Sequence, residues 1–178
     1  MKSRILAPLA ALFLVVATPA LAQKSAGDVV DDSAITTSVN SKLLASKEAP
    51  GGAINVETYK AVVLLSGFVE TEEQKAAAER IAKEASNVKE VRNKILVHSK
   101  TSMGTKFDDT MLTSKAKTAL MGADGVVSGQ IDVESKGGIV QLSGFVSSEN
   151  MRDLALAAVK KVEGVKEVDD AMFVKPAG

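Results

Sequence analysis

The sequence contains no cysteine, no tryptophan and only one histidine, and aromatic residues make up just 3% of it. Without cysteine, the chain can form neither disulfides nor thiolate metal sites. General acid–base catalysis and metal binding also need several polar groups placed together, and one histidine, His98, offers little for either. We therefore expect no catalysis, no metal and no cofactor, and we interpret His98 as a solvated residue at a strand end.

An excess of charge of one sign is also missing. Basic residues and acidic residues number 22 each. A domain that binds nucleic acid usually carries a clear basic excess, so we expect no nucleic-acid partner. Glycines stand in the middle of predicted strands rather than in a loop that leads into a helix, which argues against a phosphate-binding site. The sequence identifies no small-molecule substrate.

The first residues are typical of a secretory signal peptide. Lys2 and Arg4 precede an apolar run, Ile5–Val16, and Ala20-Leu21-Ala22 forms an A-x-A cleavage site. The run is shorter than the roughly 20 apolar residues that a membrane crossing needs. We expect cleavage after Ala22 and a periplasmic protein, and Gln23 in place of cysteine excludes a lipoprotein.

The chain does contain an internal repeat. Residues 31–97 align with residues 108–174 at an offset of 77 without a gap, and 22 of the 67 pairs are identical. Twelve of the other 45 pairs exchange one apolar residue for another, and these matches together indicate a tandem duplication. The expected segments are a signal peptide (1–22), a flexible mature N-terminus (23–30), two domains (31–98 and 108–175) and a polar linker (99–107).

Each copy has the pattern of an α-β-β-α-β unit. Apolar residues recur every four positions behind the acidic pairs Asp31-Asp32 and Asp108-Asp109, so we expect helices that begin at these pairs. The two acidic pairs could instead bind a cation, although helix capping explains them without a bound ion. Alternating strands, a hairpin turn at Lys136-Gly137-Gly138 and a capping box at Thr71-Glu72-Glu73-Gln74 follow.

The predicted fold class is α+β, with two helices on one face of a three-stranded mixed sheet in each copy. Asn87 and Gly164 stand where a left-handed helix C-cap belongs. Gly67 and Gly144 lie inside the second strand, and we expect each to be structural, because a glycine there lets a helix backbone approach closely.

The unit resembles the BON domain. That family's pattern is a V-x-L-x-G-x-V strand followed by a G-V-x-x-V-x-N segment, which reads here as Val63, Leu65, Gly67, Val69, Val88, Val91 and Asn93, and as Val140, Leu142, Gly144, Val146, Gly164, Val165, Val168 and Asp170. Asn87 replaces the turn glycine in the first copy, and Asp170 replaces the asparagine in the second. A signal peptide before two such units is similar to a group of osmotically inducible periplasmic proteins. The resemblance implies a role in envelope stress and binding of phospholipid or the cell surface.

The face of each sheet that the helices leave uncovered is a candidate interface. Period-two alternation places most of the chain's aromatic residues there, together with aliphatic neighbours: Tyr59, Val62, Leu64, Phe68, Ile139, Phe145 and Phe173. Apolar patches of this kind usually mark an interface. We favour packing of the two units against each other, and the alternative is a surface open to a partner.

The first helix of the second copy is a candidate for binding lipid or an envelope protein. It carries Lys115 and Lys117 without an acidic residue between Thr110 and Ala123, flanked by Met111 and Met121. Such a basic amphipathic segment suits anionic headgroups, although it could also be an ordinary solvated face. We expect weak, reversible binding of anionic phospholipid or an envelope partner. The alternative function is a periplasmic chaperone that uses open parts of the sheet faces.

Overall fold

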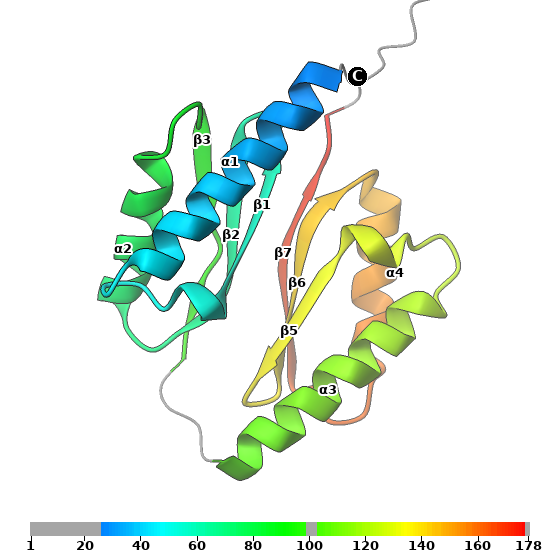
Figure 1. Cartoon of the computed structure of the whole chain (residues 1–178). Coiled ribbons are helices and arrows are strands. Elements are labelled where there is room, and N and C mark those ends of the chain that lie inside the picture. The colour runs from blue at the N-terminus through cyan, green and yellow to red at the C-terminus, as the bar shows by residue number, and fades with distance from the viewer. Residues whose placement is uncertain (1–25, 99–102, 177–178) are drawn as a thin grey trace, which may run out of the picture.

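The computed structural model describes residues 26–98 and 103–176, which form two units with the same order of elements (Figure 1). The first unit comprises α1 (Ala26–Ala45), the short 3-10 helix η1 (Gly51–Ala53), β1 (Ile54–Tyr59), β2 (Val62–Val69), α2 (Glu72–Lys83), β3 (Glu90–Asn93) and β4 (Leu96–Val97). The second comprises α3 (Met103–Met121), η2 (Ser128–Gln130), β5 (Asp132–Lys136), β6 (Ile139–Val146), α4 (Glu149–Val159) and β7 (Glu167–Val174). The expected signal peptide lies outside the described residues.

Each unit holds a mixed sheet with its second strand in the middle. β1 pairs antiparallel with β2, and β3 and β4 pair parallel with it on the other side. The second unit repeats this order as β5-β6-β7, with β5 antiparallel and β7 parallel to β6. The predicted fold class is confirmed. The third strand is continuous in the second unit and is interrupted between Asn93 and Leu96 in the first.

The two first helices begin earlier than we expected. α1 starts at Ala26 and α3 at Met103, so the acidic pairs lie inside the helices and part of each predicted flexible or linker segment is helical. The reason is that the second aspartate of each pair bonds elsewhere. Asp32 accepts hydrogen bonds from the N–H groups of Lys60 and Ala61, at 2.9 and 2.8 Å, and Asp109 accepts one from Gly138 at 3.4 Å. These carboxylates therefore hold the hairpin turn against the helix instead of capping it.

Turns and caps otherwise follow the predicted chemistry. Gly137 and Gly138 form the β5–β6 turn with φ values of 65° and 90°. In the first unit, Lys60 and Ala61 take the same left-handed backbone without glycine, and the two hydrogen bonds that their N–H groups donate to Asp32 stabilise it. Asn87, with φ at 65°, occupies the left-handed position after α2.

The N-cap of α2 at Thr71 is confirmed, whereas the return hydrogen bond of the expected capping box involves Glu70 instead of Thr71. The hydroxyl of Thr71 accepts a hydrogen bond from the N–H of Gln74, and the Gln74 side chain accepts one from the N–H of Glu70. Ser148 caps α4 in the same way and accepts from the N–H of Met151. The second helix of each copy therefore begins where the sequence predicts.

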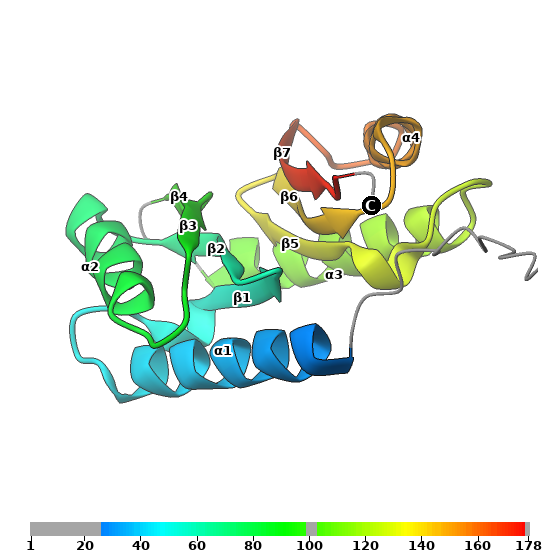
Figure 2. The ribbon, with the colours of Figure 1, turned by 90° about the horizontal axis from the view of Figure 1, so that it is seen from above.

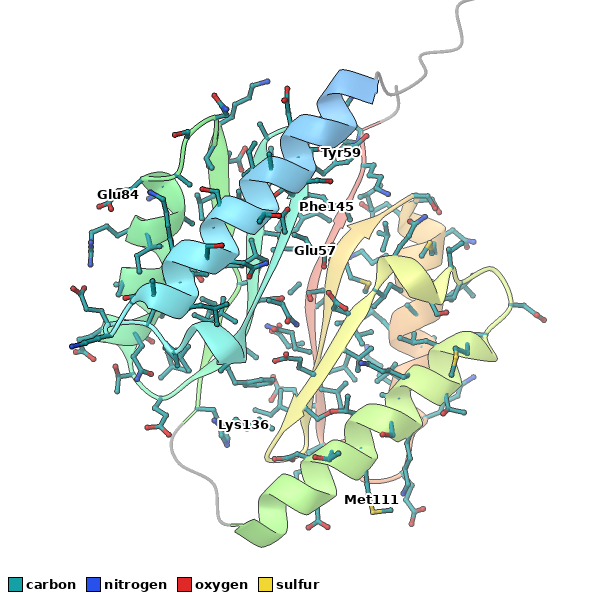
Figure 3. The ribbon with its side chains drawn as sticks, viewed as in Figure 1. Glu57, Tyr59, Glu84, Met111, Lys136 and Phe145 are labelled. Carbon is teal, nitrogen blue, oxygen red and sulfur yellow. The ribbon has the colours of Figure 1, made fainter. Side chains whose placement is uncertain are left out.

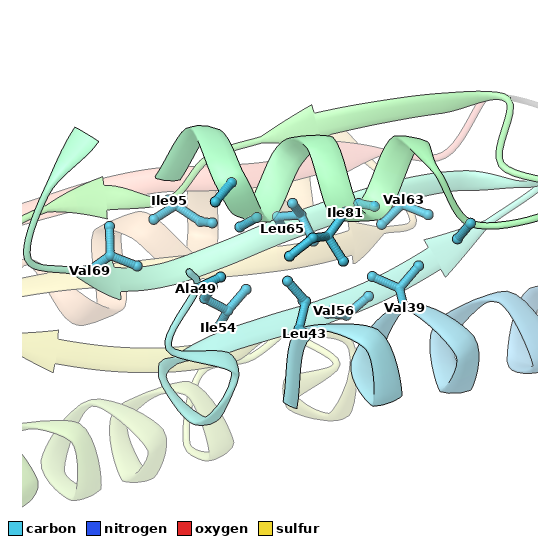
Figure 4. Packing of buried hydrophobic residues seen from close by; sticks show 14 of the residues in the cluster. Val39, Leu43, Ala49, Ile54, Val56, Val63, Leu65, Val69, Ile81 and Ile95 are labelled. Atoms are coloured by element: carbon cyan, nitrogen blue, oxygen red, sulfur yellow. The ribbon is translucent and has the colours of Figure 1, made fainter. Parts of the chain in front are cut away.

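Each unit has its own core between its helices and the covered face of its sheet. Val39 and Leu43 of α1 and Ile81 of α2 pack on Val63 and Leu65 of β2, as Figure 4 shows. The second core repeats this arrangement with equivalent residues of α3, α4 and β6. Burying each such aliphatic side chain stabilises the fold by about 1.5–3 kcal/mol.

Gly67 and Gly144 are structural for a different reason from the one we expected. Their φ values are +111° and +136°, a backbone region that favours glycine. A Cβ atom on Gly67 would lie 2.4 Å from the carbonyl oxygen of Ala53, and one on Gly144 would lie 2.2 Å from that of Gln130. The neighbour is therefore the end of a 3-10 turn (η1 or η2) rather than α1 or α3. The expected close approach of a long helix is wrong.

The two sheets meet through the faces that their helices leave uncovered. Figures 1 and 2 show the strands of both units in the middle, with α1 and α2 beside the first sheet and α4 on the far side of the second. β6 contacts both β1 and β2 across this boundary. The described part of the chain therefore forms one body in which the outer helix surfaces face solvent.

Candidate functional site

The contact between the sheets joins equivalent residues of the repeat. The hydroxyls of Ser66 and Ser143, which are 77 positions apart, hydrogen-bond to each other at 2.9 Å and are buried. A residue that contacts its own counterpart implies an approximate two-fold axis through that contact. The duplication therefore produces an interface of the kind found in symmetric dimers, inside a single chain.

The structure brings most of the predicted outer-face residues into this contact. The ring centroids of Tyr59 and Phe145 lie 5.5 Å apart, and Phe173 stands 6.4 Å from Phe145 (Figure 3 labels the first two). Leu64 and Phe68 are buried, and Val62 and Ile139 are partly buried. The units thus pack against each other here, so these faces are not an open surface for a partner.

The side chain of His98 is partly buried and packs against residues of both units. Its ring lies edge-on to that of Phe68, with centroids 6.5 Å apart. A Cβ atom on Gly137 would lie 2.8 Å from its Nε2 atom. His98 does stand at a strand end but is only partly exposed, because the hairpin turn of the second unit lies against its side chain. Among residues 26–98 and 103–176, no group of three or more His, Cys, Asp or Glu side chains is placed to hold a metal.

The centre of the contact is polar, and the contacts of Gln141 there are not visible in the sequence. Gln141 is 1% exposed, and its Oε1 atom accepts a hydrogen bond of 2.6 Å from the N–H of Gly67. Its Nε2 atom donates to the carbonyl of Lys94 at 2.8 Å and to Asp169 at 2.9 Å. One amide therefore joins β2, the β3–β4 break and β7. The signal in the sequence was a glutamine at the position where the first copy has Leu64.

Two pairs of polar side chains flank the two serines. On one side, Asn55 Nδ2 donates to Glu134 Oε1 at 3.0 Å. The equivalent pair on the other side consists of Glu57 and Asp132, two carboxyl groups. Burial raises the pKa of Glu57, and Asp132 raises it further, to about 7. Burial also raises the pKa of Glu134, although the hydrogen bond from Asn55 opposes that increase.

The predicted lipid-facing helix, α3, presents its methionines to solvent. Met111 is 47% exposed and Met121 is 68% exposed, and Figure 3 shows Met111 on the outer side of α3. Two positions on a helix differ by about 200°, so Lys115 and Lys117 lie at opposite edges of this exposed face rather than together. Lys117 is close enough to Glu134 for its charge to lower the pKa of that carboxyl.

Two shallow depressions that share Met111 and Lys115 adjoin the exposed face of α3. An open one of about 420 Å³ follows the helix and is lined by Thr110, Met111, Ser114, Lys115 and Thr118. The other, of about 400 Å³, lies where α3 meets the hairpin turn and the loop after α4, and its lining includes Met111, Lys115, Gly138 and Lys166. Lys115 is paired only loosely, at 4.0 Å from Glu163, whose side chain is 96% exposed. Such an exposed pair contributes little and leaves the ammonium group accessible.

No helix among the described residues combines the length and apolar character that a bilayer crossing requires. Peripheral contact with a membrane does not need such a helix.

Comparisons with known proteins agree with the repeat. The family model described as "BON domain" matches residues 31–99 and again residues 108–176. The chain is 38% identical to Osmotically-inducible protein Y of Escherichia coli strain K12 over 151 residues, which cover 84% of this chain and 75% of that protein. It is 28% identical to Outer membrane lipoprotein DolP of Haemophilus influenzae over 146 residues, which cover 82% and 75%.

A more distant likeness links the chain to a solved structure. That structure is of CdsD, a structural protein of the Type III secretion system of Chlamydia trachomatis, and the match has a TM-score of 0.34 and 17% identity. It covers 82% of this chain and 64% of CdsD, less than two thirds of that protein. None of the matches named indicates a catalytic family.

Proposed function

The chain belongs to the BON-domain family, and on that basis we propose that it is an exported envelope protein of the osmotic-stress type that binds anionic phospholipid surfaces reversibly, without catalysis. The names of two relatives, an osmotically inducible protein and an outer membrane lipoprotein, support the envelope and osmotic part of this proposal. The signal-peptide pattern at residues 1–22 supports export.

The exposed face of α3 is the observation that carries the membrane part. Along α3 the two exposed methionines flank the two lysines, and around the helix axis they point between them. In this arrangement the apolar groups can enter the interface while the ammonium groups stay at headgroup level. The corresponding positions of α1 hold Ala34, Ser38, Asn40 and Leu44. Of these four, only Leu44 keeps the apolar character of the second copy. The duplication has thus left a basic, methionine-bearing face on one unit alone.

The packing of the sheets weighs against the chaperone alternative. That function needs exposed apolar strand surface, and Leu64 and Phe68 are buried at the contact between the units. The two exposed methionines of α3 are ten residues apart and have two lysines between them in the sequence, which suits an anionic surface better than an unfolded polypeptide.

Co-sedimentation of the mature protein with vesicles tests the proposal. Vesicles of phosphatidylglycerol and phosphatidylethanolamine are compared with vesicles of phosphatidylcholine alone across a salt series. Each lysine near an anionic surface contributes about 1 kcal/mol, so two lysines give about a thirtyfold difference in binding constant. We expect binding only to the anionic vesicles, and we expect it to weaken as salt rises.

The variants take their residues from the first copy. Lys115→Ser with Lys117→Asn, the residues of α1, should lose most of the binding without unfolding the domain. Lys160→Ser with Lys161→Asn removes the same charge from an exposed site after α4 and serves as the matched control. Equal losses of binding in both double variants would mean that the net charge of the protein, and not the position of the lysines on α3, accounts for the binding. Absence of binding to anionic vesicles at low salt would overturn the proposal.

A further inference from the structure

The approximate two-fold axis makes two equivalent contacts chemically different. Asn55 and Asp132 occupy the same position in the two copies, as do Glu57 and Glu134. Asn55 meets Glu134 as an amide and a carboxylate, and the amide supplies the proton of their hydrogen bond. Asp132 meets Glu57 as two carboxyl groups, which can hydrogen-bond to each other only when one of them carries a proton.

The surroundings of Glu57 do not relieve this shortage of donors. Its Oε1 atom is buried without a hydrogen-bond partner, and a Cβ atom on Gly144 would lie 3.5 Å from it. From β6, the backbone N–H of Phe145 donates to the carboxyl group, and Lys175, just after β7, is the cation that acts on it. From β5, Asp132 repels it. Figure 3 shows Glu57 between the two units, near Phe145.

Charged groups of both signs lie around this pair. Asp132 also raises the pKa of Glu134, while Lys117 of α3 and the hydrogen bond from Asn55 lower it. The charge of Lys175 lowers the pKa of Glu57, and the Nζ atom of Lys175 also lies 5.6 Å from the centroid of the Tyr59 ring. Other cations at this contact lie over aromatic rings, with Lys60 beside Tyr59 and with Arg92 and Lys94 beside Phe173.

We infer that Glu57 and Asp132 form a proton-dependent contact that makes the docking of the two units sensitive to pH. With one proton shared by the pair, the second polar contact matches that of Asn55 and Glu134, and the sheets pack symmetrically. Without the proton, two carboxylates repel each other across the boundary, and the units separate more readily. This inference concerns the joint between the units and does not depend on membrane binding.

The burial of Glu57 determines in which direction, and over which pH range, docking of the two units changes. The docked state raises the pKa of Glu57 from 4.5 to about 7, so the docked state binds the proton more tightly than the separated state does. Docking is therefore most favourable below about pH 4.5, weakens as the pH rises to 7, and changes little above that.

Amide hydrogen exchange in the whole mature chain measures this equilibrium. The reporter is the N–H of Gly67, which donates to Gln141 across the boundary, and amides inside α2 report unfolding of the first unit. Asp132→Asn, which copies Asn55, lets the second pair hydrogen-bond without a shared proton. At pH 8 the Gly67 amide should exchange more slowly in this variant than in the wild type, by a factor of about ten or more. At pH 5 the exchange rates of the variant and the wild type should agree.

Two further variants make the result unambiguous. Glu57→Gln supplies the missing donor from the other side and should remove the same pH dependence. Asp153→Asn makes an equal change of charge at an exposed site on α4, and it should behave as the wild type does. If the ratio of Gly67 exchange between Asp132→Asn and the wild type is the same at pH 5 and pH 8, the inference is wrong.

Discussion

Gln141 provides a sharp test of whether polar contacts hold the two units together. Gln141→Leu places at this position the residue that its counterpart, Leu64, has in the first copy. The N–H of Gly67 and the carbonyl of Lys94 would lose their partner at a buried boundary. Each unsatisfied buried backbone group costs roughly 1–3 kcal/mol, whereas the added apolar burial contributes roughly 1 kcal/mol. We expect the free energy of unfolding to fall by about 3 kcal/mol.

Urea unfolding of the mature chain, followed by circular dichroism, measures this change. Leu64→Met is the matched control, because a swap of similar volume on the other side of the axis should cost less than about 1.5 kcal/mol. A Gln141→Leu variant as stable as the wild type, or more stable, would refute the reasoning. It would mean that apolar contact alone holds the sheets together and that the three hydrogen bonds contribute nothing net.

Two other changes test the local geometry by thermal unfolding. Gly144→Ala should lower stability by about 2–4 kcal/mol, because its φ is unfavourable for alanine and its Cβ would collide with a backbone carbonyl, whereas Gly129→Ala, with open space around it, should change little. Asp32→Ala should cost about 1–3 kcal/mol, because it removes the acceptor for the N–H groups of Lys60 and Ala61. An unchanged melting temperature in either destabilising variant would contradict the role given to that residue.

The repeat predicted the fold inside each unit well, because the signals there are local. Period-two alternation, the N-cap at Thr71 and the glycine turn at Gly137 each depend on residues close together in sequence. The starts of α1 and α3 were missed because an aspartate near a helix start predicts a cap only when its side chain has no tertiary partner. Asp32 has such partners in the hairpin turn, 28 residues away.

The Asn93–Asp170 exchange shows how a mismatch between the copies can preserve a role. Asp170 accepts from the N–H of Met172 as Asn93 does from that of Ile95. Asn93 also ties its strand to α2 by donating to the carbonyl of Lys75, and Asp170 reaches α4 through an ion pair of 2.6 Å with Arg152, the counterpart of Lys75. Both changes together keep the strand tied to the helix, which one mismatch read alone does not reveal.

The contact between the units was only partly predictable. The alternation placed Leu64, Phe68 and Phe145 on the faces that meet, but an offset of 77 residues says nothing about how two copies are oriented. The contact between Ser66 and Ser143 and the pairing of Glu57 with Asp132 depend on that orientation. These polar features therefore emerge from the structure, although the Asn55–Asp132 mismatch is visible in the repeat.

The central claim is that this chain meets an anionic membrane surface through the exposed face of α3 and not through α1 or the sheets. Amide hydrogen exchange of the mature protein, with and without vesicles that contain phosphatidylglycerol, tests this claim most directly. The account predicts slower exchange in α3, around Met111 to Met121, and unchanged exchange in α1. Equal protection of both helices, or protection confined to the first unit, would contradict it.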